Sequence, residues 1–283
     1  MELEILGSGG AFTIPKPLCN CSLCTQARQQ GHPYTRTGPS YFIHGPNILI
    51  DTPEEIKTQL NRAAITHINA AFYTHWHPDH TMGRRVWEMN LDPKGWPMKK
   101  TCTDIYIPTP VADDFRRFLG IWDHLAYLQQ QELVHLHELA TNDPLTIANV
   151  TVTPIPLAET NVFGYLFEEN GRSLLLIADE HKDWSPPANL PPIDLFIIPM
   201  GVAEFNPFTN QRRIPTNHPI LQREPTLRQT KALIAQLNPR QTIISHIEEP
   251  EQLSPDDLNT IADQWQADGL NVRFATDHMK ISL

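Results

Sequence analysis

Three histidines and one aspartate fall within six residues of the chain, in the segment THWHPDH. His75 and His77 are two positions apart, so in an extended segment both side chains point to the same side. Asp79 and His80 follow directly, and imidazole and carboxylate groups both suit zinc, manganese or iron. The spacing predicts two adjacent metals, the first held by His75 and His77 and the second by Asp79 and His80. The alternative, surface histidines beside an acidic turn, leaves the crowding of four donors unexplained.

Two further candidates stand at the ends of apolar, strand-like runs. Asp179 closes the run SLLLIAD and His246 closes QTIIS. Alone, each is weak evidence, because an aspartate after a strand is often a turn residue and a histidine there is often satisfied structurally. Beside the histidine cluster, both are expected to be metal ligands.

The cysteines suggest a second kind of metal site. Cys19, Cys21 and Cys24 form a CxCxxC pattern in a short loop, where three thiolates can converge on a structural zinc. The alternative is a set of reduced, packed thiols without metal. Cys102 stands alone and is expected to be a buried structural thiol. The small number of cysteines argues against a disulfide framework.

Short apolar or β-branched runs alternate with polar segments of helical spacing, which indicates an α/β sandwich. One domain spanning residues 1–283 is the simplest organisation. Prolines cluster in 184–192 and 207–225, so these segments are expected to be rigid loops that carry function or cover a site. The predicted strands lie in 3–10, 40–45, 47–51, 67–75, 104–109, 150–155, 162–169, 173–179, 194–201, 241–247 and 272–277. The predicted helices span 53–63, 112–119, 224–237 and 255–267.

Net charge and hydrophobicity indicate whether nucleic acid or a membrane is an expected partner. The formal charge of −10 disfavours binding to a nucleic-acid backbone, which depends on clustered lysine and arginine. No apolar stretch approaches the ~20 residues that a membrane span needs, so no membrane association is expected. The start of the sequence lacks the pattern of a signal peptide, and a cytoplasmic location is the default expectation.

Several segments, in order along nearly the whole chain, resemble the metallo-β-lactamase superfamily and, within it, the PhnP-type phosphoribosyl cyclic phosphodiesterases. The resemblance implies an αββα four-layer sandwich with two metals at the edge of the paired sheets and Asp179 as a bridging ligand. HxHxDH is specific for the superfamily, and CxCxxC after the first glycine turn narrows it to this branch. The matching segments are LGSGGAF, CNCSLCTQAR, ILIDTP, THWHPDH, PIPLAETNVFGYLFE, LLLIAD, IISHI and FATDHMKI.

The chain departs from the family pattern at two positions. The segment PIPLAET has Glu159 where the family has a histidine ligand of the first metal. A carboxylate there would shift the preference toward manganese or iron, or Glu159 does not coordinate and one metal position is weak. The family would also supply a histidine to the cysteine site three positions after His246, where this chain has Glu249. The fourth ligand stays open among Glu249, His218 and His278.

These residues together predict a metal-dependent phosphodiesterase that cleaves a small phosphate diester, plausibly cyclic, by metal-activated water. The acid that protonates the leaving oxygen is sought in the late loops, among His218, His278 and Glu224. Arg212 and Arg213 could hold a phosphate, although paired arginines in a polar loop more often face solvent.

Two other functions are alternatives to the phosphodiesterase. The CNCSLC segment is also similar to the PqqB branch, which implies an iron-dependent oxidative enzyme of cofactor biosynthesis. A metal-stabilised binding protein, with catalysis disabled by the changes at Glu159 and Glu249, is the third hypothesis. The superfamily resemblance also leads us to expect a homodimer.

Overall fold

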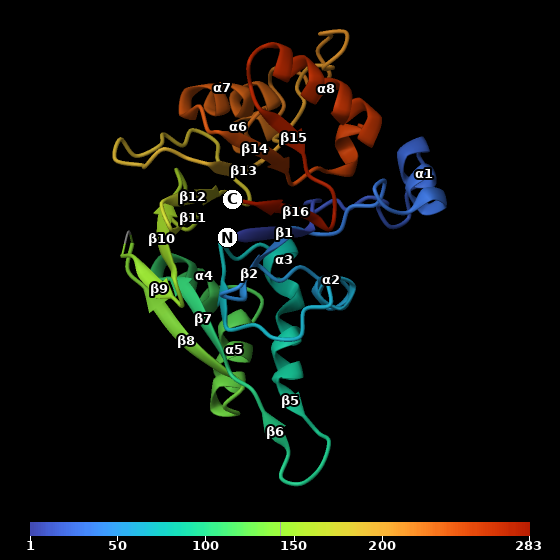
Figure 1. The fold of residues 1–283 in the computed structure, drawn as a ribbon. Helices are drawn as coiled ribbons and strands as arrows, with labels where there is room; N and C mark the ends of the chain where they lie inside the picture. The colour runs from blue at the N-terminus through green and yellow to red at the C-terminus, as the bar shows by residue number, and fades with distance from the viewer. Residues whose placement is uncertain (142) are drawn as a thin grey trace.

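The computed structural model describes residues 1–141 and 143–283 and contains two seven-stranded sheets that pack face to face (Figure 1). A two-stranded hairpin, β5 (Leu91–Asp92) and β6 (Lys99–Lys100), projects from the body. The first sheet has the strand order β16 (Met279–Ser282), β1 (Glu2–Gly7), β2 (Ser40–His44), β3 (Ile48–Ile50), β4 (Ala70–Phe72), β7 (Thr103–Pro108), β8 (Val134–Leu139). The second has the order β15 (Val272–Phe274), β14 (Gln241–Ser245), β13 (Leu195–Pro199), β12 (Arg172–Leu176), β11 (Phe163–Glu169), β10 (Val150–Pro156), β9 (Leu145–Ile147).

The strand β13 shows why its sequence builds a layered core. Side chains in a strand alternate between the two faces, and the run LFIIP is apolar at both. Leu195 and Ile197 join the core between the sheets, whereas Phe196 and Ile198 join the core under the outer helices. The inner core contains residues of both sheets, such as Phe72 and Tyr165, whose ring centroids are 5.1 Å apart.

Helices cover the outer face of each sheet and complete four layers (Figure 1). Apolar residues of α7 and α8 pack on the second sheet, and those of α2, α4 and α5 pack on the first. This arrangement confirms the predicted αββα sandwich. The helices are α1 (Ser22–Gln30), α2 (Ile56–Arg62), α3 (Pro78–Thr81), the 3-10 helix η1 (Met82–Asn90), α4 (Thr109–Arg117), α5 (Ile121–Gln130), α6 (Ile220–Arg223), α7 (Leu227–Leu237), the 3-10 helix η2 (Glu249–Glu251) and α8 (Pro255–Ala267).

Capping residues explain where two predicted helices begin. Helix α8 spans the predicted residues because Ser254 caps it and Asp257 completes a capping box. Helix α7 begins three residues later than predicted, since Thr226 is an extended cap residue whose side chain accepts from the Gln229 backbone N–H.

Some elements differ from the sequence prediction. Helices α1 and α5 and strand β8 were not predicted. Strand β8 is an edge strand. In its sequence VHLHEL apolar residues alternate with polar residues, which the sandwich leaves partly exposed.

The prediction that Cys102 is buried is wrong, because its side chain is exposed. No helix among the described residues has the length and apolarity to cross a membrane.

Candidate metal centre

The predicted metal ligands come together at the carboxyl ends of strands from both sheets. His75 and His77 follow β4, and Asp79 lies in the short helix α3 that begins directly after them. Asp179 follows β12, and His246 follows β14. Strands β3, β4 and β7 run parallel, as do β12, β13 and β14, so within each set the carboxyl ends lie at the same edge. The fold therefore brings residues that are far apart in the sequence together in one site.

The donor atoms form two groups, and within each group all of them lie within 4.8 Å of one another. Neither grouping includes Glu159. The first consists of His75, His77, Asp179 and Glu180, and the second of Asp79, His80 and His246.

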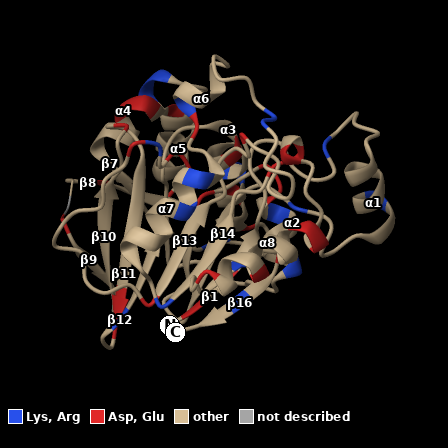
Figure 2. Ribbon diagram, turned by 90° about the horizontal axis from the view of Figure 1, so that it is seen from above, with Lys and Arg blue, Asp and Glu red and all other residues tan. Residues whose placement is uncertain are grey.

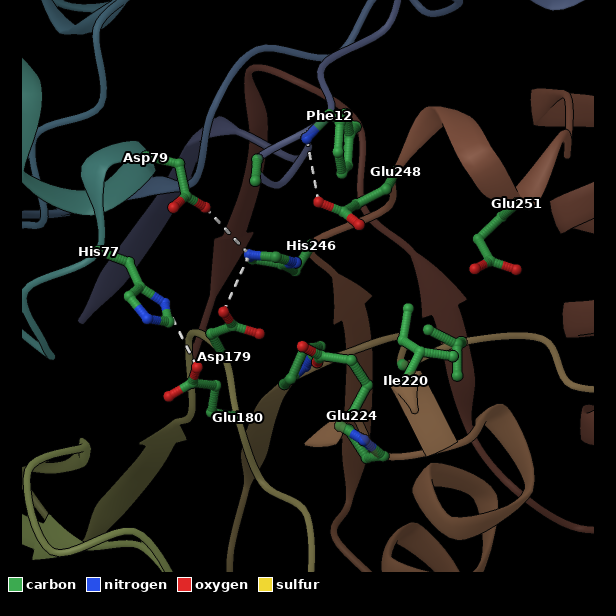
Figure 3. Close-up of a pocket in the computed structure, with 15 residues that line it drawn as sticks. Phe12, His77, Asp79, Asp179, Glu180, Ile220, Glu224, His246, Glu248 and Glu251 are labelled. Atoms are coloured by element: carbon green, nitrogen blue, oxygen red, sulfur yellow. Dashed lines mark hydrogen bonds and ion pairs between the residues drawn. The ribbon is translucent and has the colours of Figure 1, made fainter. Parts of the chain in front are cut away.

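Asp179 stands between the two groups. Its Oδ2 lies 3.9 Å from His75 Nε2 in the first group. The same oxygen lies 3.9 Å from His80 Nε2 and 3.5 Å from His246 Nε2 in the second. Asp79 Oδ2 is 3.3 Å from His80 Nε2. It also lies 3.5 Å from His246 Nε2, and this pair is drawn in Figure 3. Asp179 therefore has the position that a carboxylate bridging two ions needs.

Buried nitrogens test whether these residues fit metal ions. The Nε2 atoms of His75, His80 and His246 are buried and accept or donate no hydrogen bond within the described part of the chain. A buried polar atom without a partner costs free energy, so it calls for an explanation. Because the three atoms converge with carboxylate oxygens, the residues present fit two divalent cations.

Hydrogen bonds fix which imidazole nitrogen faces the site. Thr74 Oγ1 donates its single proton to Asp51 Oδ2 at 2.7 Å, so it accepts from His75 Nδ1 at 3.0 Å. His80 Nδ1 donates to the same Asp51 oxygen at 2.7 Å. With Nδ1 engaged in this way, the Nε2 of each ring faces the donor groups and is the nitrogen that could bind a metal.

Asp51 is a functional residue that the sequence reasoning did not single out. It is buried, it has a φ of 59°, and it also accepts from the Thr74 backbone N–H at 2.9 Å. Its position directly after the strand-like run NILI is a signal that could have found it. The carboxylate supports the ligands without lining the cavity.

The two glutamates near the first donor group differ in placement. Glu159, which the resemblance puts at a ligand position, is exposed. Glu180 was not predicted, yet its Oε1 lies 3.3 Å from His77 Nδ1 and its side chain is 14% exposed (Figure 3). The adjacent acid in the sequence ADE was the available signal.

A cavity of about 270 Å³ borders the donor groups (Figure 3). His77, Asp79 and His246 line it, and so does Glu224 from the predicted proline-rich loop. Gly10 permits this packing, because a Cβ there would lie 2.3 Å from His246 Cε1. The full lining is Ala11, Phe12, His77, Asp79, Asp179, Glu180, Pro199, Gly201, Val202, Ile220, Glu224, Pro225, His246, Glu248 and Glu251.

The other two acid candidates lie elsewhere. His218 is exposed and lines a separate hollow with Arg213. His278 lies with its Nδ1 3.4 Å from Glu4 Oε1. Arg212 stacks over the Phe205 ring, 4.3 Å from its centroid, and lines no part of the cavity. Of the predicted acids, the structure brings Glu224 to the site.

Burial and neighbouring charge shift several pKa values at the cavity. Burial, together with Asp179, raises the pKa of Glu180 to about 8 and that of Glu224 to about 7. Burial opposes the charge of His246, but Asp179 and Asp79 outweigh it and raise the pKa of this imidazole to about 9. Without a metal, these groups hold protons that a bound cation would displace.

The three cysteines of the CxCxxC pattern converge on Glu249. Its Oε1 lies 3.3 Å from Cys19 Sγ, 3.2 Å from Cys21 Sγ and 3.9 Å from Cys24 Sγ. Burial raises the pKa of Cys24 to about 11, so a thiolate at this position needs a cation beside it at neutral pH. The group fits a structural zinc, and the fourth donor beside the three cysteines is Glu249 and not His218 or His278.

The sequence matches a known family, and the fold is similar to those of solved structures. A family model described as the beta-lactamase superfamily domain matches residues 46–247. No curated protein matches the sequence. A solved diphosphatase of the PhnP family is 21% identical, with a TM-score of 0.72, and the match covers 100% of this chain and 97% of that one.

Two other solved structures share the fold. Zn(2+)-bound PqqB from Methylobacterium extorquens is 17% identical, with a TM-score of 0.72 and complete coverage of both chains. The short form of human tRNase Z is 18% identical, with a TM-score of 0.63, covering 100% of this chain and 99% of that one. The predicted PhnP resemblance is confirmed at the level of the fold. Since the matched family region runs through every predicted ligand from His75 to His246, the chain belongs to the metallo-β-lactamase superfamily.

Proposed function

We propose that this protein is a metal-dependent phosphodiesterase that cleaves a small phosphate diester. The observation that carries the proposal is the convergence of the buried, unpartnered Nε2 atoms of His75, His80 and His246 beside Asp79 and Asp179 at a cavity. When bound there, two divalent ions would lower the pKa of a water molecule and offset negative charge at phosphorus. The superfamily consists mostly of metal-dependent hydrolases, and the similar diphosphatase of the PhnP family supports phosphate chemistry.

The size and charge of the cavity favour a small monoanionic substrate. A volume of about 270 Å³ lies near the lower limit of small-molecule pockets. The lining contains several carboxylates, and none of its residues is lysine or arginine. Two divalent ions would offset part of this charge, which suits a diester with one negative charge better than a monoester with two.

Glu224 is the candidate for the leaving-group proton. It lines the cavity, and burial raises its pKa to about 7, so near neutral pH a fraction of the carboxyl groups carries a proton. In the proposed reaction a hydroxide oxygen bonds to phosphorus while the bond from phosphorus to the leaving oxygen breaks. Glu224 then gives its proton to that oxygen.

The first experiment is hydrolysis of bis(p-nitrophenyl) phosphate with manganese, zinc, nickel or iron supplied. We expect metal-dependent release of p-nitrophenol. The absence of turnover with every metal would contradict the proposal.

Two matched substitutions test the acid. Glu224→Gln should lower kcat about 10²–10⁴-fold on a diester with an alkyl leaving group. The loss should be smaller on bis(p-nitrophenyl) phosphate, whose leaving group is a stable anion. His218→Gln, in an exposed residue outside the cavity, should leave both rates unchanged. Equal losses on both substrates would rule out Glu224 as the acid.

A PqqB-like oxidative enzyme is the second candidate. The observation in its favour is the carboxylate-rich donor set, in which Asp79, Asp179 and Glu180 accompany the imidazoles, because such a set also suits iron. Iron in the purified protein, with oxygen consumed in proportion to product, would support this candidate over hydrolysis.

We also propose that nucleic acid is not a partner. In Figure 2, lysine and arginine occur on several elements, interspersed with aspartate and glutamate. Together with the net charge of −10 and the acidic cavity, this distribution favours a small-molecule substrate.

A further inference from the structure

The first donor group contains a carboxylate that neither the motif nor the family resemblance assigns. His75, His77 and Asp179 supply three of its donors, and the fourth is Glu180. The residue at the family's ligand position, Glu159, is exposed and belongs to neither group. Glu180 and Glu159 are therefore two candidates for one ligand position. Glu180 lies in the first donor group, and Glu159 does not.

The backbone turns Glu180 into the site. Its φ is +51°, in the left-handed region, where a residue with a Cβ is disfavoured by about 1–2 kcal/mol. Such strain persists where the surrounding structure requires it, and it is common at functional sites. Figure 3 shows the Glu180 carboxylate directed toward His77.

The surroundings of Glu180 indicate a cation. The side chain is mostly buried, and the polar contact recorded for its carboxylate within the described residues is the 3.3 Å contact with His77 Nδ1. In the same group, His75 Nε2 is fully buried and has no hydrogen-bond partner among those residues. A carboxylate and an unpartnered imidazole nitrogen within 4.8 Å of each other are complementary to a divalent ion between them.

We infer that Glu180, and not Glu159, is the fourth ligand of the first metal position. This rests on the binuclear centre of the proposed function and makes its first position a site of two imidazoles and two carboxylates. Oxygen donors suit manganese and iron, whereas a third imidazole would favour zinc more strongly. Glu180 thus lowers the preference for zinc over manganese relative to a three-histidine site.

The test measures metal binding instead of turnover. Glu180→Gln and Glu159→Gln make the same change at the two competing glutamates. Each variant is dialysed against manganese buffered by a chelator, and metal per chain is determined by elemental analysis. We expect Glu180→Gln to weaken the first manganese position at least about 10–100-fold, and Glu159→Gln to leave it unchanged.

A third variant tests the selectivity. Glu180→His restores a full donor set, so it should recover occupancy and raise the ratio of zinc to manganese affinity. Circular dichroism and thermal unfolding of the same samples report whether each variant is folded.

Three results would overturn the inference: weakening by Glu159→Gln alone, no weakening by Glu180→Gln, or an unchanged affinity ratio in Glu180→His. A protein that binds manganese through Glu180 but cleaves no diester would confirm the ligand and remove the phosphodiesterase proposal. The two failures are therefore distinguishable.

Discussion

Asp51 illustrates how a residue outside the cavity controls the ligands. Its carboxylate accepts from His80 Nδ1 and from both donors of Thr74, which in turn orients His75. The contact with His80 is a carboxylate–imidazole pair of the kind that fixes ring orientation and raises ligand basicity. Because Asp51 is buried, water cannot substitute for it.

We predict that Asp51→Asn weakens metal binding about 10–100-fold, because Asn replaces one of the two accepting oxygens with an NH2 group, which cannot accept from the donors of Thr74 or His80. Competition with a chelator measures the affinity. The matched control is Asp104→Asn, since Asp104 Oδ1 contacts His137 Nε2 at 2.8 Å on an exposed part of the first sheet. Equal effects of the two substitutions would show that Asp51 has no special role.

At the scale of elements, loops at the carboxyl ends of strands determine the site more than the strands themselves. The loop after β1 approaches His246 so closely that Gly10 has no room for a side chain. The cysteine loop that follows it is held to η2 through Glu249, whose Oε2 also lies 3.1 Å from Lys16 Nζ. A zinc ion would bind these two loops together.

We therefore expect Cys24→Ser to remove the structural zinc and to lower Tm. Cys24 is buried within the cluster, and structural zinc contributes its binding free energy to folding. Elemental analysis and thermal unfolding measure the two effects. Cys102→Ser changes an exposed thiol and should alter neither. An unchanged zinc content in Cys24→Ser would count against the site.

For the whole molecule, the cavity concentrates groups that bind protons when no metal is present. The pKa values of Glu180, at about 8, and Glu224, at about 7, lie above the ordinary value of 4.5. That of His246, at about 9, lies above 6.5. Between pH 6.5 and 8.5 the folded state therefore holds more protons than the unfolded state, and stability falls as pH rises.

The expected outcome is a Tm of the metal-free protein that decreases from pH 6.5 to pH 8.5, by about 2–4 °C for each kcal/mol lost. Histidines with lowered pKa values, such as His181 at about 3, act in the opposite direction, mainly below pH 6.5 and to a smaller extent just above it, where the unfolded imidazole is still partly protonated. Manganese should reverse the trend, because its binding displaces the protons. A metal-free Tm that rises over this range would contradict the charge state assigned to the cavity.

The sequence predicted the sandwich and the convergence of the HxHxDH segment with Asp179 and His246, because apolar periodicity and strand ends are local signals. It put Glu159 at the family's ligand position and did not single out Glu180, because the left-handed φ of Glu180 and its place in the first donor group arise only in the folded chain. Nor could it separate Glu224 from His218, because both lie in one proline-rich loop and only the folded path shows which faces the cavity.

Glu248 and Glu249 are neighbours in the chain but belong to different sites. Glu248 lines the cavity and accepts from the Phe12 backbone N–H at 3.0 Å, while Glu249 joins the cysteine cluster. A metal that selects one conformation of this segment also selects one shape of the cavity wall. If zinc binding at the cysteines alters the cavity through this segment, linkage requires that a molecule bound in the cavity change the zinc affinity by the same factor. A zinc ion at the cysteines would then be an equilibrium effector of the cavity as well as a brace.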